Sequence, residues 1–217
     1  MPKPTTIAAL RSLVTAWTPA PLARRDANVA TGVPALDAAL GGGLPRGRVT
    51  ELVSAAPSSG GDLVFGALLA STRAARLRVA LIDAADGFAP RNYPADWLRH
   101  LVWIRARSLS EALGCADVLA RDGNHAVLAL DVRGVPLRAL RQQPAGAWHR
   151  LRLAAEQNAG AILVQSATGL VPAVPWRLAL RTAASLDELR RPRAARVAAL
   201  AVEVERGRAG AREELAG

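Results

Sequence analysis

The sequence predicts an α/β domain with a mostly parallel central sheet and helices on both faces. Three short apolar runs support this, at residues 77–83 (LRVALID), 126–131 (AVLALD) and 160–165 (GAILVQ). Each is close to the usual strand length of about six residues and is apolar enough for burial on both sides. Segments with helical spacing lie between the runs, and this alternation is typical of parallel sheets built from crossover connections.

The other elements are predicted from the same spacing rules. A Ser108 or Ser110 cap with Glu111 in the first turn favours a helix over residues 108–121. Trp97 and Trp103 should lie on one side of the chain if the apolar run at 98–104 is extended. In chain order we further expect a helical turn at 34–40, a strand at 48–53, a helix at 63–72, a loop at 84–96, a helix at 148–158, and strands at 176–186 and 197–204.

The length of 217 residues suits one domain with short extensions. We expect a core domain at 29–205, an amino-terminal helix and linker at 1–28, and a mobile tail at 206–217. Helical spacing places four apolar residues of the first segment on one face, where they can pack on their own domain or bind a partner protein. We predict the partner-binding role for these residues, which are Ile7, Leu10, Val14 and Trp17.

The composition favours a soluble, cytoplasmic protein. No apolar run approaches the roughly 18 residues of a membrane span, and the amino terminus is a poor secretory signal. Cys115 is the only cysteine, so neither an internal disulfide nor a cysteine metal site is expected. The formal charge of +10 comes almost wholly from arginine and is compatible with an anionic partner or with a solvated surface.

Residues 41–69 have the layout of a phosphate-binding loop: a glycine-rich turn, a strand, a small-residue loop and the start of a helix. A working loop needs glycines, a lysine for the terminal phosphates and a hydroxyl for magnesium. Here Gly60 keeps a glycine, but Gly61 stands at the lysine position and Asp62 at the hydroxyl position. We therefore expect no catalytic residue, no cofactor and no metal at the degenerate loop, which comprises Ala55, Pro57, Ser58, Ser59, Gly60, Gly61 and Asp62.

The carboxyl ends of the strands form the edge at which parallel sheets bind ligands. Asp131, at the end of one strand, occupies the place of a metal-site acid, although such an aspartate can also simply cap the loop. Arg133, Arg138 and Arg141 follow it and are candidates for contact with DNA phosphates.

Four segments resemble, in order and spacing, the core of the RecA recombinase family. They are VATGVPALDAALGGGLPRGRVTEL, LIDAADGFAP, SLSEALGCADVLARDGNHAVLALD and LRLAAEQNAGAILVQS, and the similarity covers roughly residues 29–205. The resemblance implies that the family's phosphate-loop lysine maps to Gly61 and its catalytic glutamate to Ala85, whereas its metal-site aspartate is kept as Asp131. ATP hydrolysis is therefore not expected. The family's DNA-binding loops would follow Asp131 and Gln165, and both look shortened here.

A small, arginine-rich chain with a RecA-like core and a degenerate phosphate loop looks most like the ImuA family, RecA-like accessory proteins of bacterial mutasome operons. That resemblance implies a role in damage-induced translesion synthesis beside an inactive Y-family polymerase homologue and an error-prone replicative-type polymerase. The predicted partners are RecA and these mutasome proteins. DNA binding through an arginine surface, an ATPase with a displaced site and a SulA-type cell-division inhibitor are the alternatives.

Overall fold

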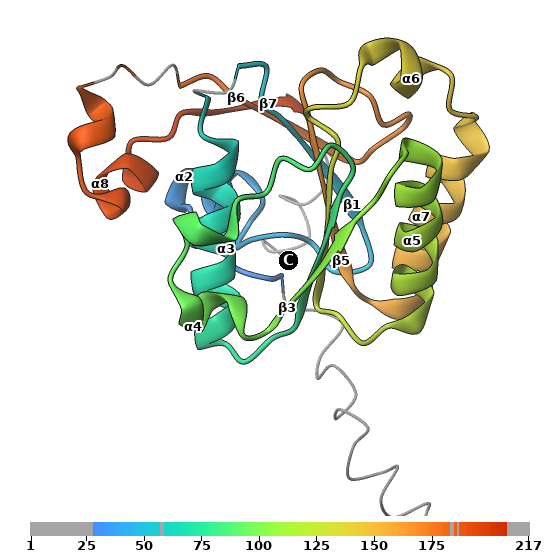
Figure 1. Ribbon diagram of the computed structural model, residues 1–217, viewed down its shortest axis with the longest axis horizontal. Coiled ribbons are helices and arrows are strands. Elements are labelled where there is room, and N and C mark those ends of the chain that lie inside the picture. Colours follow the sequence, from blue (N-terminus) through green and yellow to red (C-terminus); the bar gives the residue numbers. More distant parts are fainter. Residues whose placement is uncertain (1–27, 57–58, 183–184, 186, 208–217) are drawn as a thin grey trace, which may run out of the picture.

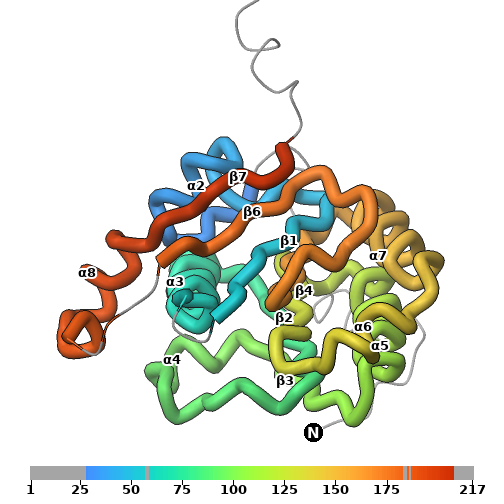
Figure 2. The backbone as a smooth tube through the Cα atoms, turned by 90° about the horizontal axis from the view of Figure 1, so that it is seen from above, coloured from blue at the N-terminus to red at the C-terminus, as the bar shows by residue number. Residues whose placement is uncertain are grey.

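The computed structural model describes residues 28–56, 59–182, 185 and 187–207. Within them lies a seven-stranded sheet in the order β3-β2-β4-β5-β1-β6-β7 (Figures 1 and 2). The first six strands in this order are mutually parallel, and β7 is antiparallel to β6. This is the predicted fold class. The predicted amino-terminal helix with its four contact residues, most of the predicted tail, and Pro57 and Ser58 of the loop lie outside the described residues.

The strands predicted at 48–53, 77–83, 126–131 and 160–165 are confirmed as β1, β2, β4 and β5. Their register places Asp83 beside Asp131 and Asp131 beside Gln165, so the carboxyl ends of three neighbouring strands meet at one edge. The strands are β1 (Val49–Val53), β2 (Val79–Asp83), β3 (Leu101–Arg105), β4 (Val127–Asp131), β5 (Ala161–Ser166), β6 (Trp176–Leu180) and β7 (Val202–Arg206).

The helices cover both faces of the sheet, as Figure 1 shows. Because side chains alternate along a strand, Leu81 faces one layer while Ala80 and Ile82 face the other. The layer around Leu81 contains α2 (Pro34–Ala39), α3 (Gly61–Ala74), α4 (Ala95–Leu98) and α8 (Arg193–Ala198). The opposite layer contains α5 (Leu109–Asp122), α6 (Leu137–Arg141) and α7 (Ala145–Asn158), and two single-turn 3-10 helices, η2 (Pro90–Asn92) and η3 (Glu188–Arg190), complete the described elements.

Prolines explain most of the differences from the predicted elements. Pro94, Pro136, Pro144 and Pro192 each stand directly before a helix, because proline lacks an N–H that the first turn would leave unsatisfied. The predicted loop 84–96 therefore contains η2 and the start of α4. The region after Asp131 holds α6, and α7 begins before residue 148.

Three further predictions need correction. The segment 197–204 is not one strand, because its first residues belong to α8 and β7 starts only at Val202. The strand predicted at 176–186 ends at Leu180. Trp97 lies in α4 rather than in an extended segment with Trp103, so the two rings do not share a strand. Among the described residues, no helix has the length and apolarity needed to cross a membrane.

Candidate functional site

The loop between β1 and α3 is closed by its own side chains. Gly60 is the N-cap of α3 with φ of 97°, in the left-handed region that favours glycine. The buried Ser59 hydroxyl accepts a hydrogen bond of 3.1 Å from the Ala56 N–H. A Cβ on Gly60 would also collide with Leu200 beside α8. The loop thus keeps its backbone shape while its serine is engaged internally.

Arg133 brings a cation to the loop from the opposite side of the site. Its Nη2 lies 2.7 Å from Asp62 Oδ1 and 2.5 Å from Asp131 Oδ2, and its Nε donates to Asp131 Oδ1 at 3.0 Å. A Cβ built on Gly61 would overlap Arg133 Nη1. The guanidinium therefore fills the space from which a lysine side chain at position 61 would start.

Electrostatics stabilise this arrangement. Burial alone would lower the pKa of Arg133, but the hydrogen bond and charge of Asp131, with those of Asp62, raise it above its usual value. Asp131, whose side chain is only 13% exposed, accepts three hydrogen bonds from Arg133, one of them from its backbone N–H. The aspartate at the metal position is thus already neutralised by an arginine.

The neighbouring β2 end is also occupied by structural hydrogen bonds. Asp83 is 1% exposed and accepts from the N–H groups of Ala85, Gly87 and Phe88, at 3.3, 3.0 and 2.9 Å. It therefore holds the turn that contains Ala85, the residue to which the resemblance maps the family's glutamate. In the described part of the chain, no three or more His, Cys, Asp or Glu side chains are placed so that they could hold one metal ion together.

A cavity of about 330 Å³ opens over these residues. Among the described residues, its lining carries three carboxylates, Asp62, Asp83 and Asp131, against one cation, Arg133. This acid excess opposes a polyphosphate, which a working phosphate loop attracts with lysine and magnesium.

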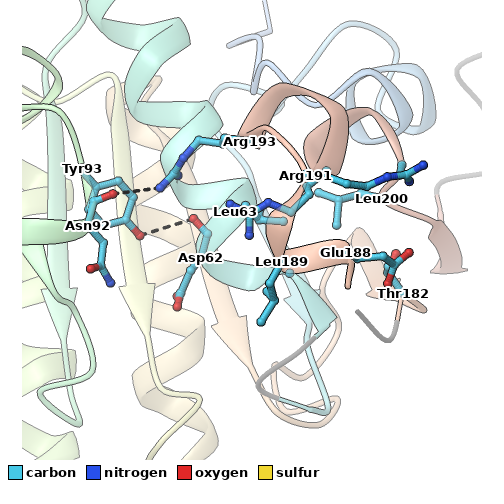
Figure 3. Close-up of a pocket in the computed structure, with 13 residues that line it drawn as sticks. Asp62, Leu63, Asn92, Tyr93, Thr182, Glu188, Leu189, Arg191, Arg193 and Leu200 are labelled. Carbon is cyan, nitrogen blue, oxygen red and sulfur yellow. Dashed lines mark hydrogen bonds between the residues drawn. The ribbon is translucent and has the colours of Figure 1, made fainter. Parts of the chain in front are cut away.

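A second cavity, of about 320 Å³, lies beside the loop between α3 and α8 (Figure 3). Three arginines, Arg191, Arg193 and Arg196, line it together with the backbone at Gly60 and the side chain of Leu63. We call it the α3–α8 pocket. Sequence reasoning did not single it out, although four arginines between residues 190 and 196 were a visible signal.

Arg193 is fixed in the wall of the α3–α8 pocket. Its guanidinium lies over the rings of Tyr93 and Trp97, with centroid distances of 5.2 and 5.8 Å. The same guanidinium donates to the Asn92 carbonyl at 2.9 Å (Figure 3). It also fits against α3 at Gly66, where a Cβ would overlap Arg193 Nη1. Arg193 therefore anchors α8 to α3.

A buried ion pair organises the loop after β5. Glu51 of β1 is fully buried and accepts from the Ser166 hydroxyl at 2.9 Å, the Leu170 N–H at 2.7 Å and Arg177 Nε at 2.7 Å. Arg177 also donates to the Val171 carbonyl at 2.9 Å. Sequence reasoning missed this network, for which the signal was a single glutamate inside an apolar strand.

The three candidate DNA contacts do not have the same environment. Arg133 is engaged with Asp62 and Asp131, whereas Arg138 and Arg141 are exposed on α6, three residues apart and thus on one side of the helix. Neither forms an ion pair within the described residues.

Comparison with known proteins finds similarity to RecA over about half of this chain, and no family model matches it. The chain is 35% identical over 107 residues to RecA of Chlorobaculum tepidum, covering 48% of this chain and 30% of that protein. It is 34% identical over 111 residues to RecA of Rubrobacter xylanophilus, covering 50% and 32%, and 38% identical over 111 residues to RecA of Leifsonia xyli, covering 48% and 29%. The chain thus spans about a third of the length of the curated relatives it matches. Together with the sheet, these matches support a relationship between this chain and the RecA family.

Proposed function

We propose that this protein is a non-catalytic RecA-like adaptor of an SOS-type DNA damage response. In this role it supports error-prone translesion synthesis by binding RecA, mutasome proteins or both, and it restrains RecA-driven recombination. The observation that carries the proposal is Arg133, which occupies the space of the missing lysine and pairs with both carboxylates of the site.

The charge balance argues against nucleotide hydrolysis. A phosphate loop accelerates phosphoryl transfer by positioning and by neutralising the developing negative charge. Asp62 adds negative charge at the mouth of this site, and Ala85 has no group that could activate a water molecule. A fold that keeps its sheet but lacks these groups is best suited to presenting surfaces.

One such surface is the free edge of β3. Among the described residues this strand pairs only with β2, and its Val102 is 45% exposed. The five residues of β3 include a single charge, Arg105, at the carboxyl end. An apolar edge strand offers unpaired backbone groups to an extended segment of another protein. The predicted helix from Ile7 to Trp17 supplies a second contact on the adaptor side.

The decisive experiment is capture of purified RecA and of the mutasome proteins by the immobilised chain, with and without residues 1–20. Val102→Lys should weaken capture at the β3 edge, whereas Val118→Lys, at a valine of α5 that is 66% exposed, should leave it unchanged. The adaptor role is refuted if none of these proteins is captured and the rate of RecA strand exchange is unchanged.

A thermal measurement tests the absence of nucleotide binding separately. A ligand that binds only the folded state raises the melting temperature. We expect no shift with ATP and magnesium, and a concentration-dependent rise would contradict the non-catalytic assignment.

DNA binding is the second candidate function, favoured by the exposed pair Arg138 and Arg141. Affinity for a single-stranded oligonucleotide should then fall steeply with salt, because each phosphate contact releases counterions. Arg138→Ala with Arg141→Ala should reduce the slope of that dependence. If binding is undetectable at low salt, this candidate is excluded.

A further inference from the structure

We propose that the α3–α8 pocket receives an acidic segment of a partner protein, with a carboxylate beside a large apolar side chain. This inference deepens the proposed adaptor role and rests on it, because it states the chemistry of a partner surface. The pocket is distinct from the β3 edge and from the arginines of α6.

The charges around the pocket are unbalanced in favour of an incoming carboxylate. Both acids among the described lining residues already have partners: Asp62 pairs with Arg133, and Glu188 accepts a 2.7 Å hydrogen bond from the Ser185 N–H. Arg191 and Arg196, in contrast, form no ion pair with any described residue. Arg196 Nε is also buried without a hydrogen-bond partner in this part of the chain. A buried donor without an acceptor is costly, and a carboxylate would satisfy it.

The pocket also has an apolar side that suits a protein side chain. Leu63 of α3, Leu189 of η3 and Leu200 line it, and Leu189 is 54% exposed (Figure 3). Its volume of about 320 Å³ is at the low end of ligand pockets, which measure roughly 300–1,000 Å³. An apolar anchor residue with flanking carboxylates therefore matches both the shape and the charge of the lining.

The same geometry disfavours a nucleotide. Phe88 stacks on Tyr93 with a centroid distance of 5.1 Å and an interplanar angle of 22°, and Arg193 lies over the Tyr93 ring at 5.2 Å. Among the described lining residues Tyr93 has the only aromatic ring, and Phe88 and Arg193 already pack on it, which disfavours stacking of a base there.

The test uses a fluorescent ten-residue peptide with the core Glu-Glu-Leu-Glu-Phe and its Gln-Gln-Leu-Gln-Phe counterpart, measured by anisotropy on the full chain. We expect the acidic peptide to bind and the neutral one to bind at least about tenfold more weakly, because its charge-assisted hydrogen bonds are lost. Arg191→Ala with Arg196→Ala should cause a similar loss, and Leu189→Ala a smaller one. The matched control, Arg138→Ala with Arg141→Ala, removes the same net charge elsewhere and should leave binding intact.

Several results would overturn the inference. It fails if the acidic peptide does not bind, if both double variants lose affinity for it equally, or if ATP displaces it. Tighter peptide binding after deletion of residues 208–217 would also overturn it, because that segment would then be the occupant. Capture of RecA or mutasome proteins by the Arg191→Ala, Arg196→Ala variant is a separate measurement. If the peptide does not bind but RecA or a mutasome protein is still captured, the pocket assignment is wrong while the adaptor role stands.

Discussion

Arg133 Nη2 lies 2.7 Å from Asp62 Oδ1, although the two residues are 71 positions apart in the chain. This ion pair joins the first turn of α3 to the turn after β4, across the site where a phosphate would bind. Asp131 completes the contact on the β4 side, so a single guanidinium links two elements of the carboxyl edge. The cation beside this loop is thus engaged in structural ion pairs.

Arg133→Ala should destabilise the protein by about 1–3 kcal/mol, because it leaves the largely buried Asp131 without its counter-ion and three hydrogen bonds. Urea denaturation measures the change in the free energy of unfolding. Arg138→Ala, at an exposed arginine of α6 without an ion pair among the described residues, is the control and should change stability by no more than about 0.5 kcal/mol. Equal midpoints for the wild type and Arg133→Ala would show that the ion pairs contribute nothing.

Gly61→Lys should lower stability and should not restore ATP binding, because its side chain would start in the space of the Arg133 guanidinium. The double variant Gly61→Lys, Arg133→Ala should be more stable than the sum of the two single changes predicts. Residues in contact show such coupling energies of about 0.5–3 kcal/mol. Strict additivity in a double-mutant cycle would place the lysine away from Arg133 and contradict the steric argument.

Glu51→Gln should cost about 3 kcal/mol, since it removes one partner of a buried ion pair and leaves Arg177 without a counter-charge. The loop at 167–175 should also become more sensitive to proteolysis, because its N–H groups lose a charged acceptor. Glu203→Gln makes the same chemical change in an exposed pair with Arg181 and should cost much less, because solvent screens exposed ion pairs. Similar losses of stability in both variants would mean that the burial of Glu51 does not strengthen its contribution to the free energy of unfolding.

The sheet could be predicted from sequence because its strands are specified locally. The runs that became β2, β4 and β5 are short, apolar and separated by helical segments, and each of these signals depends only on neighbouring residues. The helix boundaries at the prolines could not be predicted, because neighbouring residues alone do not show whether a proline ends or starts an element. Prolines end strands and helices, but Pro136 and Pro192 also start helices, and only packing of Leu140 and Val197 against the core decides between the two.

The site could be predicted only in part. That Gly61 and Asp62 are not the lysine and hydroxyl residue of a working phosphate loop is visible in the sequence, since it concerns the residue types at fixed positions. That Arg133 supplies a cation to them is not, because the pairing depends on the register of β4 with its neighbours and on the turn after it. Glu51 with Arg177 and Arg193 with Tyr93 are contacts between distant segments and were missed for the same reason.

Tyr93 gives a direct spectroscopic measure of the environment beside the loop, because it is the only tyrosine in the chain. Burial, followed by the charge of Asp62, raises the pKa of Tyr93 from 10.0 to about 12. A raised pKa means that the folded state binds the phenolic proton more tightly than the unfolded state does. The resulting stabilisation is complete below pH of about 10 and is lost as the pH rises from there through about 12.

Titration of tyrosinate absorbance should therefore show a midpoint near 12 for the folded chain and near 10 in denaturant. Asp62→Asn should lower the folded midpoint, because it removes a negative charge that disfavours the phenolate. Asp117→Asn, on α5, removes an equal charge on the opposite face of the sheet and should leave the midpoint unchanged. A folded midpoint near 10 would place Tyr93 in solvent and would also reopen its ring face to stacking, contrary to the packing of Phe88 and Arg193 around it.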